Sequence, residues 1–209
     1  YDWEDGDMVD DQDKIRMLVD PTSDYVKAMV ASLNRAKDDV IISSLGGNSR
    51  STSGNIILPT AQKIAVGGTN LTKAKIIQAK TLFRTNEADE EAGEELYMLY
   101  NAAAAAQILA DTTLTSTDYL AGQFLREGSV RGKWMGFNWI PTERCPKVST
   151  TRFLYAYAKS GVTLGKGADI MTKVGEDPGK GFNVRIYAKM SIGSVRVEEE
   201  KVVEIACLE

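Results

Sequence analysis

The chain has 209 residues, of which 43% are hydrophobic and 26% are charged, and its formal net charge is −4. A chain of this length can bury a proper core, and its composition is typical of a globular protein with one domain or two interleaved lobes. The acidic balance argues against a dedicated nucleic-acid binder, because the basic stripe of such a protein dominates its net charge. No apolar run approaches the ~20 residues needed to span a bilayer, so we expect no membrane partner.

The sequence contains no histidine. This absence excludes Ser-His-Asp and Cys-His nucleophile activation and every zinc site that requires imidazole. Cys145 and Cys207 form no metal motif, and we expect two unpaired thiols in a reducing, cytoplasmic setting. The glycine-rich stretches GVTLGKG and GEDPGKG fail as phosphate loops because their glycines are one residue too close, so both are predicted to be turns. No catalytic residue, cofactor or metal ligand is predicted.

The chain begins with the acidic stretch YDWEDGDMVDDQDK, which we expect to be an extended surface segment. Gly6 lacks the regularly spaced oxygen ligands of a calcium loop. The first residue is Tyr1 rather than methionine, so we expect the natural chain to begin upstream.

A long helix is predicted from Pro21 to Leu45. Asp20 is a suitable cap, Pro21 suits the first helical position, and two glycines follow as a stop signal. At 1.5 Å per residue the helix is roughly 37 Å long. Apolar and polar side chains separate onto opposite faces at helical spacing. The apolar face comprises Val26, Met29, Val30, Leu33 and Val40, and the polar face comprises Asp24, Lys27, Asn34, Arg35 and Asp38.

The middle of the chain predicts short alternating elements. We expect a strand at 56–58, a helix within 71–86, a strand at 94–100 that runs into a helix at 102–111, and a helix at 116–128. The second helix has a predicted inner face of Ile76, Ile77, Ala79, Lys80 and Phe83. Asn101 is the expected cap of the third. Strands with internal turns are predicted between 132 and 167.

The C-terminal part predicts a long strand from Phe182 to Val197. Apolar residues alternate with polar ones without a break from Phe182 to Ile192, which is the period of a strand with one buried face. The apolar parity changes between Ile192 and Val195, as a β-bulge would cause. The eleven alternating residues span roughly 36 Å at 3.3 Å per residue, nearly the length of the long helix, so we expect the two to lie side by side as a helix-on-sheet layer.

The order of these elements resembles that of the major capsid proteins of tailed bacteriophages, which have the Hong Kong 97 capsid fold. The resemblance rests on four stretches, at 13–48, 95–111, 136–146 and 156–205, and covers nearly the whole chain. It implies an α+β fold with a spine helix beside long antiparallel strands in a peripheral domain, and an inserted α/β axial domain. Residues 1–20 would be the end of an extended loop, 21–68 and 168–209 the peripheral domain, and 69–167 the axial domain.

The resemblance further implies a structural protein and not an enzyme. Copies of the chain would form hexamers and pentamers of an icosahedral shell that encloses double-stranded DNA without sequence-specific binding, assembled in the bacterial cytoplasm and found in the virion. Scaffolding, portal and decoration proteins would be further partners. The resemblance also implies an N-terminal arm ahead of Tyr1.

Several side chains are candidates for subunit contacts. Aromatic residues are enriched in interface hot spots, which selects Trp134, Phe137 and Trp139, although these three could instead fill the core of the axial domain. The run Glu198, Glu199 and Glu200 could face a basic partner or form a solvated turn. DNA or an acidic neighbour could lie against a set of basic residues, for which a solvated helix face is the alternative: Arg35, Lys37, Lys73, Lys75 and Lys80.

Three other functions remain open from the sequence. An encapsulin-like compartment would share the fold but would hold protein cargo in place of a genome. A monomeric binding module would form no particle. A carboxylate enzyme using Glu94 and Glu95 would need a cleft in which the two pKa values differ, and nothing in the spacing of the carboxylates favours it.

Overall fold

The computed structural model describes residues 1–9, 22–52, 54–111 and 132–209. The chain forms two compact units. Unit 1 comprises residues 1–41 and 164–194, and unit 2 comprises residues 42–163 and 195–209. The predicted caps at Asp20 and Pro21 and the predicted helix at 116–128 lie outside the described residues.

The long helix is present as α2 (Thr22–Gly46). In unit 1 it buries Met29, Leu33 and Val40. Every residue of the predicted polar face is exposed, including Arg35. The sequence pattern therefore predicted both the helix and the face that it turns toward the core.

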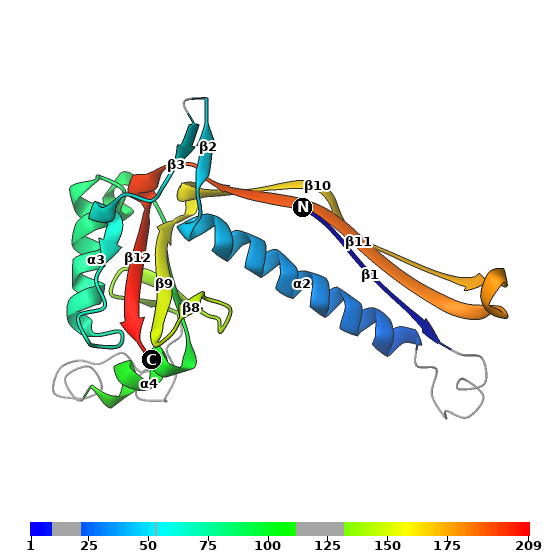
Figure 1. Ribbon diagram of the computed structural model, residues 1–209. Helices are drawn as coiled ribbons and strands as arrows, with labels where there is room; N and C mark the ends of the chain where they lie inside the picture. Colours follow the sequence, from blue (N-terminus) through cyan, green and yellow to red (C-terminus); the bar gives the residue numbers. More distant parts are fainter. Residues whose placement is uncertain (10–21, 53, 112–131) are drawn as a thin grey trace. The chain divides into compact units, whose positions relative to one another are not determined.

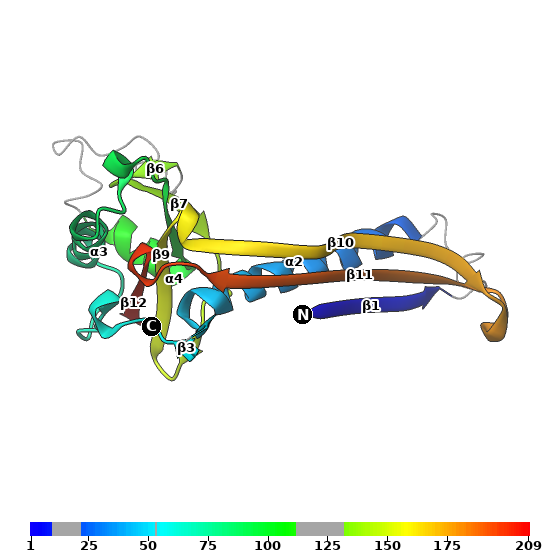
Figure 2. The ribbon, with the colours of Figure 1, turned by 90° about the horizontal axis from the view of Figure 1, so that it is seen from above.

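A three-stranded sheet covers the apolar face of α2 in unit 1 (Figures 1 and 2). Its strands lie in the order β1 (Asp2–Val9), β11 (Asn183–Arg196) and β10 (Val162–Asp177). Strands β1 and β11 are antiparallel. The even-numbered residues of β11 face the helix and complete the core of unit 1: Val184, Ile186, Ala188, Met190 and Ile192. The predicted helix-on-sheet layer is confirmed.

The predicted parity change near Gly193 is wrong. Val195 is 43% exposed and Arg196 is 2% exposed, so the alternation of β11 continues to its end. Arg196 can occupy this inward position because its guanidinium donates hydrogen bonds to backbone carbonyls. The strand also begins one residue later than predicted, since Phe182 has a φ of 62° in the turn before it.

Unit 2 is built on a seven-stranded sheet. The path runs β4 (Lys63–Ile64), β12 (Val202–Leu208), β9 (Thr151–Ala158), β5 (Leu96–Tyr100), β7 (Phe137–Pro141) and β6 (Lys133–Trp134), and β8 (Lys147–Val148) pairs with β9. Strand β12 pairs parallel to β4 and antiparallel to β9. The C-terminal strand therefore lies inside this sheet.

Two helices complete the core of unit 2. Helix α3 (Lys73–Thr85) buries Ile76, Ala79 and Phe83 as predicted, but Ile77 is 47% exposed and Lys75 is buried instead. Helix α4 (Ala102–Ala110) follows β5 directly, and the Asn101 side chain caps it by accepting from the Ala104 backbone N–H. A small hairpin of β2 (Ser49–Ser51) and β3 (Gly54–Ile56) replaces the strand predicted at 56–58.

The two units divide the chain at different residues from the expected domains. Residues 42–68 and 195–209 were expected in the peripheral domain, and they belong to unit 2. The reason is strand pairing, because β4 and β12 join the same sheet as β9 and β5. The peripheral and axial roles themselves stay predictions.

Two adjacent isoleucines on α3 test this packing. We expect Ile76→Ala to lower the free energy of unfolding by about 2–5 kcal/mol, because Ile76 is fully buried and its truncation leaves a cavity. Ile77→Ala should change it by less than about 0.5 kcal/mol, because the side chain is on the surface. Urea denaturation followed by circular dichroism measures both values. Equal losses in the two variants would contradict the assigned helix face.

Candidate assembly surfaces

The aromatic candidates lie on the β6–β7 hairpin of unit 2. Phe137 is fully buried, and its ring centroid lies 6.0 Å from that of Phe83 in an edge-to-face arrangement. Trp139 is 6% exposed, and its indole N–H donates to the Trp134 carbonyl at 3.0 Å. Phe137 and Trp139 therefore fill the core of unit 2, which was the alternative to a role in subunit contacts. Trp134 is only half-buried, and an interface role stays a prediction for it.

The basic candidates occupy different environments. Arg35 is exposed on α2, and Lys73 is exposed at the start of α3. The Lys37 ammonium pairs with Asp169 of β10 at 3.2 Å within unit 1, and Lys80 pairs with Glu90 within unit 2. These contacts leave Arg35 and Lys73 as the most accessible cations of the set.

Lys75 does not lie on a solvated face. It is 7% exposed, and its ammonium donates to the carbonyls of Val66 at 2.9 Å, Thr69 at 2.8 Å and Ala206 at 2.8 Å. Burial lowers its pKa. The side chain thus links α3 to the preceding loop and to β12. Its spacing of four residues from the buried Ala79 was the sequence signal that could have placed it inside.

The glutamate run forms a short turn ahead of β12. Glu199–Lys201 is a single 3-10 turn. Glu198 is exposed and pairs with Lys201 at 3.2 Å, Glu199 lies 3.8 Å from the Arg196 side chain, and the Glu200 carbonyl accepts from Asn86 at 3.4 Å. Glu198 and Glu200 therefore fit the solvated-turn alternative, and a contact with a basic partner stays a prediction.

A serine, a lysine and a carboxylate meet in unit 2, but their charges do not suit catalysis. The Lys201 ammonium donates to the Ser160 hydroxyl at 2.9 Å and to Glu94 at 3.2 Å, and the Ser160 hydroxyl also donates to Glu94. Burial opposes the lysine charge, but Glu94 and Glu198 raise the pKa of Lys201 overall. The Ser160 hydrogen bond and Lys201 lower the pKa of Glu94. The charged Lys201 cannot accept the serine proton, and the lowered pKa makes Glu94 a weak general base, so Ser160 is not strongly activated.

Cys145 and Cys207 are free and buried. Burial raises the pKa of Cys145 to about 12 and that of Cys207 to about 11, so neither is an activated nucleophile. Within the described ranges, no group of three or more His, Cys, Asp or Glu side chains could hold a metal ion. None of the helices that the structure describes is both long and apolar enough to cross a membrane.

The face of the unit 1 sheet that points away from α2 carries charged and aromatic side chains. On this face Glu4 lies opposite Lys189, and Met8 lies opposite Arg185. The Arg185 guanidinium lies 5.8 Å from the Tyr187 ring centroid, and burial and the Glu4 carboxylate raise the pKa of Tyr187.

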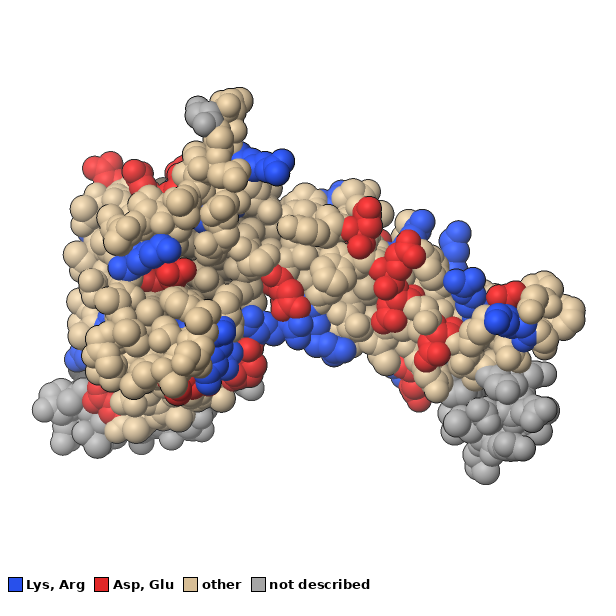
Figure 3. Space-filling model, viewed as in Figure 1, with Lys and Arg blue, Asp and Glu red and all other residues tan. Residues whose placement is uncertain are grey.

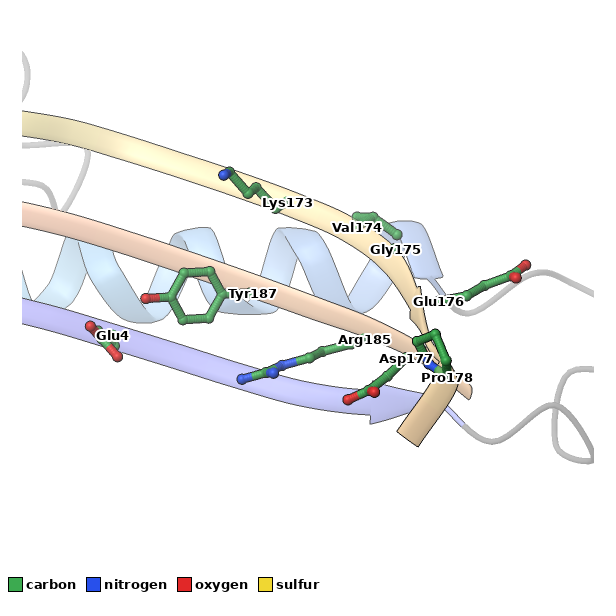
Figure 4. Close-up of a pocket in the computed structure, with 9 residues that line it drawn as sticks. All are labelled: Glu4, Lys173, Val174, Gly175, Glu176, Asp177, Pro178, Arg185 and Tyr187. Atoms are coloured by element: carbon green, nitrogen blue, oxygen red, sulfur yellow. The ribbon is translucent and has the colours of Figure 1, made fainter. Parts of the chain in front are cut away.

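An open hollow of about 630 Å³ adjoins these strands at the turn between β10 and β11 (Figure 4). Its lining carries both signs of charge and comprises Glu4, Lys173, Val174, Gly175, Glu176, Asp177, Pro178, Arg185 and Tyr187. Figure 3 likewise shows acidic and basic side chains interspersed on each unit. Such surfaces suit protein contacts better than a strongly basic nucleic-acid track.

Sequence reasoning missed Arg196, which is the largest fully buried side chain in the part of the protein that the structure describes. Its guanidinium donates to the carbonyls of Leu45 at 2.9 Å, Gly47 at 2.6 Å and Ile56 at 3.1 Å. The Ser49 hydroxyl donates to the Arg196 carbonyl at 3.0 Å, and burial lowers the pKa of Arg196. The unbroken alternation of β11 was the signal that would have placed this residue inward.

Comparison with known proteins identifies the family. The family described as phage capsid protein matches residues 1–209. This chain belongs to the phage capsid protein family. It is therefore a structural component of a virion capsid and not an enzyme, and copies of it associate into a shell. No curated protein matches the chain.

Solved structures share the fold of this phage capsid protein. A structure from Mycobacterium phage Che8 is 18% identical with a TM-score of 0.73, covering 98% of this chain and 70% of that one. The capsid structure of cyanophage P-SCSP1u is 17% identical with a TM-score of 0.75, covering 100% and 72%. The SrpI encapsulin complex of Synechococcus elongatus PCC 7942 is 10% identical with a TM-score of 0.64, covering 98% and 72%. The predicted α+β Hong Kong 97-type fold is confirmed.

The different environments of two lysines on α3 can be tested by substitution. We expect Lys75→Met to lower the free energy of unfolding of the capsid protein by about 1–3 kcal/mol, because three buried carbonyls lose their donor. Lys73→Met is the matched control and should leave stability nearly unchanged, since Lys73 is exposed. Urea midpoints at neutral pH compare the two. A larger loss for Lys73→Met would contradict the role assigned to Lys75.

Proposed function

We propose that this protein is the major capsid subunit whose copies form hexamers and pentamers of an icosahedral shell around a double-stranded DNA phage genome. The observation that carries the proposal is the family match over residues 1–209. It is supported by the fold, which the chain shares with solved capsid structures over 98–100% of its length. The mechanism is association, in which closed symmetry repeats modest contacts at every subunit.

Contact with the genome would not depend on DNA sequence. The net charge is −4, and acidic and basic side chains are mixed on the pictured face of each unit (Figure 3). Specific readout requires side chains presented to base edges by a basic surface. Exposed cations such as Arg35 could neutralise phosphates locally.

The domain roles follow from the same proposal. Residues 69–167 would be the axial domain around the five-fold and six-fold axes, residues 21–68 and 168–209 the peripheral domain, and residues 1–20 the end of an extended loop. Trp134, Arg35 and Glu198–Glu200 are the candidate contact residues. Scaffolding, portal and decoration proteins would be further partners during assembly.

A second candidate is an encapsulin-like compartment, favoured by the fold match to the SrpI encapsulin complex. The two functions predict different contents, because a phage shell encloses nucleic acid and a compartment encloses protein.

Electron microscopy of the full-length protein tests the proposal. We expect negative-stain images and mass photometry to show closed shells, because a capsid subunit repeats its contacts by symmetry. Expression with and without scaffolding protein, at low and moderate salt, controls for conditions of assembly. Nuclease-protected DNA inside the particles supports the phage function, and protein cargo supports the compartment. A stable monomer under every condition would overturn both.

A further inference from the structure

The hairpin of β2 and β3 stands apart from the other strands of unit 2. It forms a two-stranded sheet of its own, with Ser49 opposite Ile56. The hairpin projects from unit 2 in Figure 1. An isolated two-stranded hairpin has marginal stability in water. Residues 49–57, of which residue 53 is not described, are called the arm below.

Arg196 holds the base of the arm in place. Its guanidinium donates to the Gly47 carbonyl just before β2 and to the Ile56 carbonyl at the end of β3. The Ser49 hydroxyl returns a hydrogen bond to the Arg196 backbone. A buried arginine is costly unless its donors find acceptors, and two of the three carbonyls that accept from this guanidinium lie at the two ends of the hairpin. Arg196 is therefore a positioning residue for the arm.

The arm carries two exposed isoleucines and an exposed cation, and Ile56 lies on the face of the hairpin opposite to Arg50. Ile57 is 65% exposed and Ile56 is 38% exposed. Arg50 is exposed on the paired strand, and no carboxylate of the described residues forms an ion pair with it. This combination fits a partner surface that is apolar with an acidic rim.

A groove with these properties lies on the outer side of α3 in the same unit. It has a volume of about 520 Å³. Its apolar lining includes Ile77, which is 47% exposed, and Met135. Met135 has a φ of 50° in the two-residue turn before Gly136, a backbone conformation that favours Asn, Asp or Gly. Backbone strain of this kind clusters at binding sites.

The rim of the groove has more acidic than basic side chains. Asp89, Glu90 and Glu91 line it together with Lys80 and Arg84. Arg84 already pairs with Asp89 at 3.0 Å and Glu91 at 2.6 Å. Glu90 pairs with Lys80, so the lining carries one carboxylate more than its two cations, and Glu91 is the carboxylate whose side chain is most exposed, at 75%. A further cation brought by a partner would meet Glu91, which gives the groove electrostatic complementarity to Arg50.

The hairpin of β2 and β3 lies apart from α3, whose side chains line the groove, in both ribbon views (Figures 1 and 2). A subunit therefore does not fill its own groove with its own arm, but a second copy can. A contact between two different patches of identical copies is heterologous, and it closes into a ring when the rotation between copies divides a full turn. Rings of this kind are what the proposed shell function requires.

We propose that the arm of each subunit docks in the α3 groove of a neighbouring copy, with Ile57 against Ile77 and Met135 and with Arg50 at the acidic rim. This inference rests on the proposed shell function and names one of its contacts. It assigns a role to the exposed isoleucines, to the buried Arg196 and to the strained Met135.

Disulfide trapping between two variants of the full-length protein tests the contact. Ile57→Cys and Ile77→Cys chains are co-assembled and mildly oxidised, so any bond between positions 57 and 77 joins different chains. The native thiols are protonated at neutral pH, because burial raises the pKa of Cys145 to about 12 and that of Cys207 to about 11. We expect a dimer that disappears on reduction. Val148→Cys is the matched control for Ile77→Cys, because Val148 is also exposed, at 65%, but lies outside the groove.

A charge exchange provides a second measurement that does not depend on cysteine. Arg50→Glu should lower the assembled fraction about fivefold, the effect of losing a strong surface pair, and Glu91→Arg in the same chain should restore it. Particles without the 57–77 disulfide, or an unchanged assembled fraction with Arg50→Glu, would overturn the contact and leave the shell function standing. Failure of the unsubstituted protein to form particles would overturn the shell function together with the contact.

Discussion

The alternation of β11 is the constraint on which both units depend. From Val184 to Ile192 its inward side chains form the core of unit 1 with α2, and the same parity then carries Arg196 into the interior of unit 2. A slip of one residue would turn every inward side chain to the opposite face. The apolar core of unit 1 would then be exposed, and the hydrogen bonds from Arg196 to the base of the arm would be lost.

The interior of unit 2 relies on cations that bind backbone carbonyls. The Lys75 ammonium has three carbonyl acceptors, and the Arg196 guanidinium has three more. A buried charge without partners costs several kcal/mol. Because carbonyl oxygens at strand and loop ends need donors as well, each cation satisfies acceptors from segments that are distant in the chain. These two side chains thus connect α3, β12 and the arm to the rest of the unit.

The pairing of charged side chains in unit 2 also suits a structural shell subunit. The titratable groups of unit 2 are arranged as ion pairs and hydrogen bonds that fix loops, as in the network of Glu94, Ser160 and Lys201. The pKa values of Glu94 and Lys201 are displaced toward the charged forms. This is the pattern of structural pairing, in contrast to an active site in which one group is driven toward its neutral form. Function in the capsid protein therefore depends on which surfaces meet other copies.

The amino-acid sequence by itself determined the elements whose signals are local. The face of α2, the alternation of β11 up to Ile192 and the cap of α4 by Asn101 depend on residues a few positions apart. The absence of histidine excluded whole classes of catalytic and metal site without any structure. Periodicity therefore predicted the layers of unit 1.

The tertiary structure alone decided which residues enter the core of unit 2. Lys75 and Arg196 are buried because acceptors up to 151 positions away surround them, and Phe137 and Trp139 are core residues because α3 and β5 cover them. Strand β12 joins β9 and β4 rather than the long strands of unit 1. Local periodicity shows that a face is buried, but only the three-dimensional pairing of distant segments decides what lies against it.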